Sequence, residues 1–130
     1  EQRAGGAALI KANAERLGVR PAAVLEANAI DLLQGDLPAG LEQPNRVLVG
    51  GGGRQRNTLL QLVLERLEPT GTVVVPLATV ESLSGVRRLL EDANMTVRIS
   101  QLQAWRGQPL SDGTRLAPMN PILTVSGTKQ

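Results

Sequence analysis

The sequence of 130 residues contains no cysteine and no histidine, and Trp105 is its only aromatic residue. Without cysteine or histidine, the chain has no disulfide, no thiol nucleophile, no Cys/His zinc site and no Ser-His-Asp triad. Histidine is the usual general base, so proton transfer would fall to a carboxylate, a lysine or the substrate itself. One aromatic side chain also leaves almost no means of binding nucleic-acid bases by stacking.

The charges are nearly balanced and carry no block of one sign. Fourteen basic and twelve acidic residues give a net charge of +2, and they are interspersed, so we expect no nucleic-acid partner. No apolar run approaches membrane-spanning length and no signal peptide is recognisable, which predicts a cytoplasmic protein without a membrane partner. Apolar residues make up 42% of the chain. We therefore expect one globular domain over residues 1–130, with an aliphatic core.

A run of four glycines, Gly50 to Gly53, is the most distinctive stretch that is present. It follows Val47-Leu48-Val49, which is typical of a short buried strand, and it precedes a segment with helical spacing. A glycine turn between a parallel strand and a helix is where α/β proteins bind ligands. The run matches neither a Walker loop nor a GxGxxG fingerprint, and a flexible loop without a ligand is the alternative.

The remaining pattern alternates helices with strands. Helical spacing predicts helices over residues 7–17, 58–67 and 81–93, with Gly18 as the C-terminal cap of the first and a single turn at 30–33. Strands are expected at 22–26, 47–49, 72–75, 96–104 and 122–126, and loops at 34–45 and 106–118. Such alternation predicts an α/β fold with a mostly parallel sheet and an antiparallel C-terminal hairpin at its edge.

The chain resembles the class I S-adenosylmethionine (SAM)-dependent methyltransferases. Within them it is most similar to the precorrin-6Y C5,15-methyltransferase (decarboxylating) family, in the C-terminal domain that methylates C15. Four stretches carry the resemblance: residues 8–19, 47–53, 79–81 and 120–122. The resemblance implies a Rossmann-like sheet and SAM as cofactor. The first strand and glycine loop of that fold have no counterpart in residues 1–130, so we expect a chain truncated at its N-terminus, which alone would bind SAM poorly.

The resemblance implies roles for several residues near the cofactor. Glu1 corresponds to the acidic residue that holds the ribose hydroxyls, and a carboxylate can accept from two vicinal hydroxyls. Asn28 and Ala29 stand where Gly-Asp-Ala usually lies beside adenine, with Asn28 in place of the aspartate. Gly50, Gly51 and Gly52 complete the expected cofactor contacts. The alternatives are a frayed terminus for Glu1 and a turn residue for Asn28. The tetraglycine bend and Glu1 are expected to border one cleft.

The substrate implied by the resemblance is a precorrin or cobalt-precorrin, a tetrapyrrole with many carboxylates. Methyl transfer to C15 would accompany loss of carbon dioxide from the ring C acetate. Guanidinium groups suit such a polyanion, and we expect Arg54 and Arg115 to contact it. Thr79, Glu81 and Asn120 are candidates for steering the acetate. The structural alternatives are a solvated surface arginine for Arg54 and Arg115, a helix N-terminal carboxylate for Glu81 and a turn residue before proline for Asn120.

No metal site is expected, and a homo-oligomer, with a tetramer as one form, is the expected assembly. Two alternatives stay open. One is another class I methyltransferase that acts on RNA or protein, although its Asn/Asp-Pro-Pro-aromatic motif is absent after the strand at 47–49. The other is a cofactor-free α/β module kept for oligomer contacts.

Overall fold

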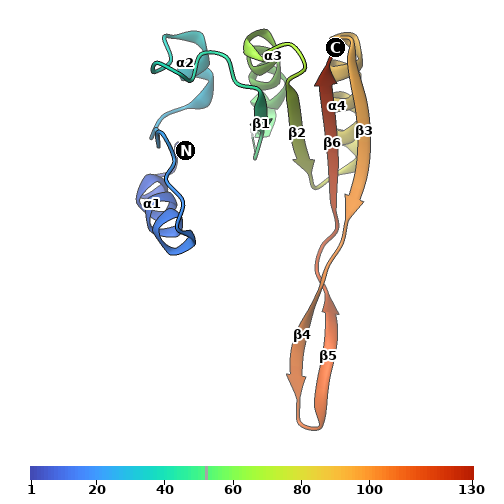
Figure 1. Cartoon of the computed structure of the whole chain (residues 1–130). Coiled ribbons are helices and arrows are strands. Elements are labelled where there is room, and N and C mark those ends of the chain that lie inside the picture. The colour runs from blue at the N-terminus through green and yellow to red at the C-terminus, as the bar shows by residue number, and fades with distance from the viewer. Residues whose placement is uncertain (52) are drawn as a thin grey trace. The chain divides into compact units, whose positions relative to one another are not determined.

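The computed structural model describes residues 1–51 and 53–130, which form two compact units, Glu1–Glu42 and Gln43–Gln130 (Figure 1). Each unit is described by itself, and the expectation of one domain over residues 1–130 stays a prediction. Among the described residues, no helix is long and apolar enough to cross a membrane.

The first unit consists of two helices joined by extended chain. Helix α1 spans Gly6–Leu17 and α2 spans Ala29–Gln34. The predicted cap at Gly18 is confirmed, because Gly18 is left-handed (φ 66°) and its N–H donates to the carbonyls of Ala14 and Glu15. Helix α2 begins after Asn28, whose side chain accepts a hydrogen bond of 2.9 Å from the Ile30 N–H.

The predicted strand at residues 22–26 is wrong as a strand. A strand exists only through its pairing, and here the pairing is limited to one residue. The Glu1 nitrogen donates to the Leu25 carbonyl at 3.0 Å, and the Ala27 N–H donates to the Glu1 carbonyl at 3.1 Å. In a parallel ladder, a residue bonds to the two residues that flank its partner on the neighbouring strand, as Glu1 does with Leu25 and Ala27. Glu1 therefore lies beside the extended chain as the end of a parallel neighbour would.

The second unit contains a four-stranded sheet in the order β1-β2-β6-β3. Strand β1 (Arg46–Leu48) pairs parallel with β2 (Thr72–Leu77), whereas β6 (Ile122–Lys129) is antiparallel to both β2 and β3 (Met95–Leu102). Strands β1, β2 and β3 thus run in one direction. The α/β class is confirmed, and so is the antiparallel C-terminal hairpin at the sheet edge, which β3 and β6 form. By pairing, however, this sheet is mostly antiparallel rather than mostly parallel, because β6 lies between β2 and β3 and is antiparallel to both.

Two helices cover one face of this sheet. The short helix η1 (Gly53–Gln55) leads into α3 (Arg56–Arg66), and α4 (Val80–Asp92) connects β2 to β3 (Figure 1). Alternate residues of β2 are buried against them, as a strand with one covered face requires. The core of the unit is aliphatic and consists of Val49, Leu60, Val63, Leu67, Val73, Val75, Leu77, Val86, Leu90, Met95 and Val125.

The predicted loop at residues 106–118 is instead a β-hairpin. Strand β4 (Trp105–Leu110) pairs antiparallel with β5 (Gly113–Pro118), and Figure 1 shows this pair extending as an arm beyond β3 and β6. Its residues are almost all exposed, so no alternation between a buried and a solvated face marks it in the sequence. The pair forms through backbone bonding and cross-strand contacts.

Candidate functional site

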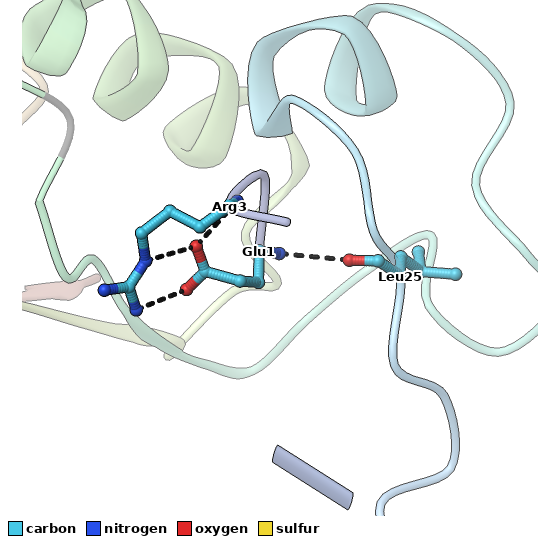
Figure 2. A network of polar contacts seen from close by, with 3 residues as sticks. All are labelled: Glu1, Arg3 and Leu25. Carbon is cyan, nitrogen blue, oxygen red and sulfur yellow. Dashed lines mark hydrogen bonds and ion pairs between the residues drawn. The ribbon is translucent and has the colours of Figure 1, made fainter. Parts of the chain in front are cut away.

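The Glu1 carboxylate is held by Arg3 (Figure 2). Arg3 Nε donates to Glu1 Oε1 at 2.9 Å, Arg3 Nη2 donates to Oε2 at 3.2 Å, and the Arg3 N–H donates to Oε1 at 3.0 Å. These bonds, the side-chain ones first, lower the pKa of Glu1 from 4.5 to about 2. The carboxylate is therefore ionised at any physiological pH. Oε1 accepts two of these three bonds and Oε2 accepts one, so Oε2 has more acceptor capacity left.

Gly6 makes room for the Glu1 side chain. Gly6 is buried at the start of α1, and a Cβ placed on it would overlap Glu1 Cγ and lie 3.1 Å from Glu1 Cδ. Any other residue at position 6 would therefore push the carboxylate from its place. The absence of a side chain at Gly6 and the ion pair with Arg3 together fix Glu1.

An open cavity of about 330 Å³ lies against Glu1 within the first unit. Glu1 has the only polar side chain among its lining residues, and the rest are aliphatic or proline, including Ile10, Leu25, Leu32 and Leu41. An apolar pocket of this size with one charged group at its wall suits a small ligand that has an apolar face and a hydrogen-bonding edge. Sequence reasoning did not find this cavity, because its apolar residues come from separate segments.

The predicted cofactor residues lie in both units. Ala29 lines the same cavity as Glu1, whereas Asn28 beside it uses its carbonyl oxygen to cap α2. Gly50 and Gly51 belong to the second unit, where they follow β1, and Gly52 lies outside the described residues. Gly51 has φ 95°, a conformation that side chains other than glycine rarely adopt.

The carboxyl edge of the second unit's sheet brings together several of the candidate residues. Because β1 and β2 are parallel, the chain after each strand leaves at the same edge, with Gly50 and Gly51 on one side and Thr79 and Glu81 on the other. Leu77 at the end of β2 pairs with Leu123 of β6, so Asn120 precedes β6 at this edge too. The structure thus places Thr79, Glu81 and Asn120 at the end of the sheet where the glycine run begins.

Thr79 has a structural task at this edge. It is the N-cap of α4, and its Oγ1 accepts from the Ser82 N–H at 3.3 Å and donates to Ser82 Oγ at 3.0 Å. Glu81 is exposed in the first helical turn, where the helix dipole favours a carboxylate. The structural alternative weighed for Glu81 is therefore present in the fold, and Thr79 also has a structural role as a helix cap.

The two expected substrate arginines lie on separate elements. Arg54 is in η1, directly after the glycine run, and is exposed. Arg115 is on the exposed hairpin, where its Nε and Nη2 donate to Gln108 Oε1 of β4 at 3.2 and 2.9 Å. In the described part of the chain, β5 pairs with β4 alone, and no bond joins the two arginines.

Arg56 is the residue at this edge that sequence reasoning passed over. Its Nε donates to the Gly51 carbonyl at 3.0 Å and its Nη1 donates to Ser82 Oγ at 3.1 Å. Two features of the sequence could have indicated this residue. Arg56 stands at the start of a helix five residues after Gly51, and Thr79-x-x-Ser82 is a helix cap pattern. Among the described residues, no group of three or more acidic side chains could hold a metal ion.

Comparisons with known proteins place this fold and these sites in a family. A model of the precorrin methyltransferase domain family matches residues 1–129. The chain is 34% identical over 119 residues to a probable cobalt-precorrin-6B C(15)-methyltransferase (decarboxylating) of Pyrobaculum aerophilum, covering 91% of this chain and 58% of that relative. The chain thus spans a little over half of the length of that protein.

Two solved structures show the same fold. Precorrin 8W decarboxylase of Methanobacterium thermoautotrophicum superposes with a TM-score of 0.84 at 22% identity, covering 98% of this chain and 66% of the other. A SAM-dependent O-methyltransferase of Thermotoga maritima gives a TM-score of 0.70 at 14% identity, covering 99% and 48%. These likenesses establish the class I methyltransferase fold. Because the family match extends over residues 1–129, the chain belongs to the precorrin methyltransferase domain family.

Proposed function

We propose that the protein methylates C15 of a precorrin or cobalt-precorrin and decarboxylates its ring C acetate in cobalamin biosynthesis, with SAM as methyl donor. The methyl group passes from the sulfonium to C15, which leaves S-adenosylhomocysteine. Carbon dioxide leaves the acetate, and the conjugated macrocycle takes up the electron pair. The protein's main task is alignment of the reacting atoms, which suits a chain without histidine or cysteine.

The observation that carries the proposal is the cavity beside Glu1 in a chain of this family. Its aliphatic wall suits the faces of an adenine ring, and the Glu1 carboxylate at its rim suits the ribose hydroxyls. Ala29 is part of that wall. The Asn28 side-chain NH₂ remains able to donate to a ring nitrogen, since only its oxygen is engaged with Ile30.

The glycines and the polar edge of the second unit supply the rest of the proposed contacts. Gly50, Gly51 and Gly52 are proposed to let the cofactor approach the bare backbone. A Cβ added at Gly50 or Gly51 would meet nothing within 4 Å, so the space above these two residues is open. Thr79, Glu81 and Asn120 are proposed to steer the acetate, and Arg54 and Arg115 to bind peripheral carboxylates of the tetrapyrrole.

We also propose that the protein is a homo-oligomer. The β4–β5 hairpin favours this, because an isolated two-stranded hairpin is only marginally stable in water and both of its outer edges are unpaired among the described residues. It exposes Trp105, Leu110 and Leu116. Analytical ultracentrifugation of the protein and of a Trp105→Ser, Leu116→Ser variant tests this, and a monomeric wild-type protein would contradict it.

The proposed function is tested by calorimetry with S-adenosylhomocysteine and by incubation with SAM and the tetrapyrrole. We expect the protein to bind S-adenosylhomocysteine. Mass spectrometry of the tetrapyrrole should then show the gain of one methyl group and the loss of one carbon dioxide. Absence of nucleoside binding would favour a cofactor-free module instead.

A further inference from the structure

The Arg56 guanidinium joins the segment after β1 to the start of α4, and Ser82 in that helix is 26 residues from Arg56 in the sequence. One nitrogen donates to the Gly51 carbonyl and another donates to Ser82 Oγ. Gly51 follows β1 and Ser82 is in the first turn of α4, which follows β2. The planar fork of a guanidinium can hold two acceptors at a fixed spacing, which a lysine ammonium cannot do. Arg56 thus sets the separation between the glycine run and the first turn of α4.

The acceptors of Arg56 are themselves fixed. Ser82 Oγ also accepts from Thr79 Oγ1, and Thr79 Oγ1 in turn accepts from the Ser82 N–H. A hydroxyl oxygen has two acceptor positions, so Arg56 and Thr79 together fill those of Ser82. At the other end, Gly51 has φ 95°, and its carbonyl accepts the hydrogen bond from Arg56 Nε. The chain of bonds therefore runs without a gap from Gly51 to the cap of α4.

Neighbouring arginines do not share this role. Arg54, two residues earlier, is exposed in η1. Arg87 of α4 is exposed and pairs with Glu91 one turn along its own helix, at 2.7 Å. Arg56, at the first residue of α3, is placed so that its guanidinium bonds to both segments.

We propose that Arg56 is a positioning residue for the reaction. It fixes the distance between the backbone after β1 and the residues Thr79 and Glu81. The first is the proposed side of the methyl donor, and the second is the proposed side of the acetate. This inference rests on the proposed function. Since misplacement of reacting groups by about 1 Å can reduce a rate roughly 100-fold, loss of the link should act on the rate and leave binding intact.

The test compares the variants Arg56→Gln, Arg56→Lys and Ser82→Ala of the protein, with Arg87→Ala as the control. We expect Arg56→Gln to lower kcat roughly 10- to 100-fold, with KM for the tetrapyrrole and Kd for S-adenosylhomocysteine changed less than about threefold. Arg56→Lys should restore little of the lost rate, because all donors of an ammonium sit on one nitrogen and cannot hold the two acceptors at the spacing that Nε and Nη1 set. The double variant Arg56→Gln, Ser82→Ala should be no slower than Arg56→Gln alone.

A second readout is the product ratio. If the bonds of Arg56 are lost, part of the substrate should be methylated without being decarboxylated. Mass spectrometry should then detect methylated tetrapyrrole that retains its acetate carboxylate. If Arg56→Gln unfolds the protein, Ser82→Ala carries the test, since it removes only one hydroxyl. A kcat equal to that of Arg87→Ala, or a loss confined to KM, would overturn the inference. A wild-type protein that transfers no methyl group would overturn the proposed function itself.

Discussion

The two units of the chain differ most in how they bury apolar side chains. Ala14 is the only buried hydrophobic residue that the first unit contributes among the described residues, and eleven others belong to the second unit. Leu9, Leu17 and Val19 of the first unit are exposed, whereas Leu60 and Leu90 of the second are fully buried. The first unit therefore has almost no core of its own.

This difference indicates a division of tasks. A segment as short as Glu1–Glu42 is near the size at which a chain needs help to stay folded. Its aliphatic residues line an open cavity beside a carboxylate, so a ligand that binds there would stabilise the unit by mass action. The second unit, with its close-packed sheet and helices, should determine the global stability. The predictions below test this contrast.

The largest effect is expected from the core of the second unit. Leu90→Ala should lower the free energy of unfolding by about 2–5 kcal/mol, because it opens a cavity between α4 and the sheet. The matched change Leu9→Ala removes the same atoms from a side chain that is 59% exposed, and should cost less than about 0.5 kcal/mol. Urea unfolding measures both. Equal losses would contradict the contrast between the units.

A smaller effect is expected when Glu1 is changed to glutamine. The variant keeps the shape of the side chain but removes the charge, so we expect the affinity for S-adenosylhomocysteine to fall about tenfold, as for loss of a charge-assisted hydrogen bond. Urea unfolding should be unaffected. Glu15→Gln, on the exposed face of α1, is the control. Unchanged affinity in the Glu1 variant would remove Glu1 from the cofactor site.

Local patterns in the sequence were sufficient for the helices and for most of the sheet. The apolar spacing at 81–93 and the cap at Gly18 have local causes, so they could be predicted. The position of β6 between β2 and β3 could not, because strand order depends on contacts between distant segments. The segment at 22–26 has strand-like residues, but its pairing in the structure is limited to Glu1. Local propensity alone therefore does not decide whether this segment forms a strand.

The candidate site shows the same limit at the level of single residues. Arg54 and Arg56 both follow the glycine run, and composition gives no reason to prefer either. The start of α3 decides between them, because it turns Arg56 toward Gly51 and Ser82 and leaves Arg54 in η1. Thr79 was proposed because residues 79–81 carry part of the resemblance to the methyltransferase family, and its role as the cap of α4 is a finding of the structure. Whether it also steers a substrate is a property of the ligand-bound protein and stays a prediction.

A still smaller effect is expected from a variant that displaces the Glu1 carboxylate but keeps its charge. Gly6→Ala keeps the carboxylate but displaces it, since the new Cβ would occupy the place of Glu1 Cγ. We expect the affinity for S-adenosylhomocysteine to fall severalfold, and the double variant with Glu1→Gln to bind no worse than Glu1→Gln alone. Stability should not fall, because alanine favours helix over glycine by about 0.5–1 kcal/mol.

The control for this experiment is Gly85→Ala in α4, where a Cβ would meet nothing within 4 Å. It should raise stability by a similar amount without changing nucleoside affinity. If Gly6→Ala also leaves affinity unchanged while urea unfolding confirms a folded protein, then the placement of Glu1 by Gly6 has no bearing on the ligand.

The smallest effect concerns the ion pair itself. Arg3→Ala removes the donors that lower the pKa of Glu1, so the pKa should rise from about 2 toward 4.5, as a carboxyl NMR titration would show. The pair stabilises the folded state above pH 4.5, and this stabilisation is lost as the pH falls toward 2. Arg3 is largely exposed, so the loss should be small. Arg16→Ala, in α1 of the same unit, is the control. A Glu1 pKa that stays near 2 in Arg3→Ala would show that another donor holds the carboxylate, and that the cavity wall is more polar than its aliphatic lining indicates.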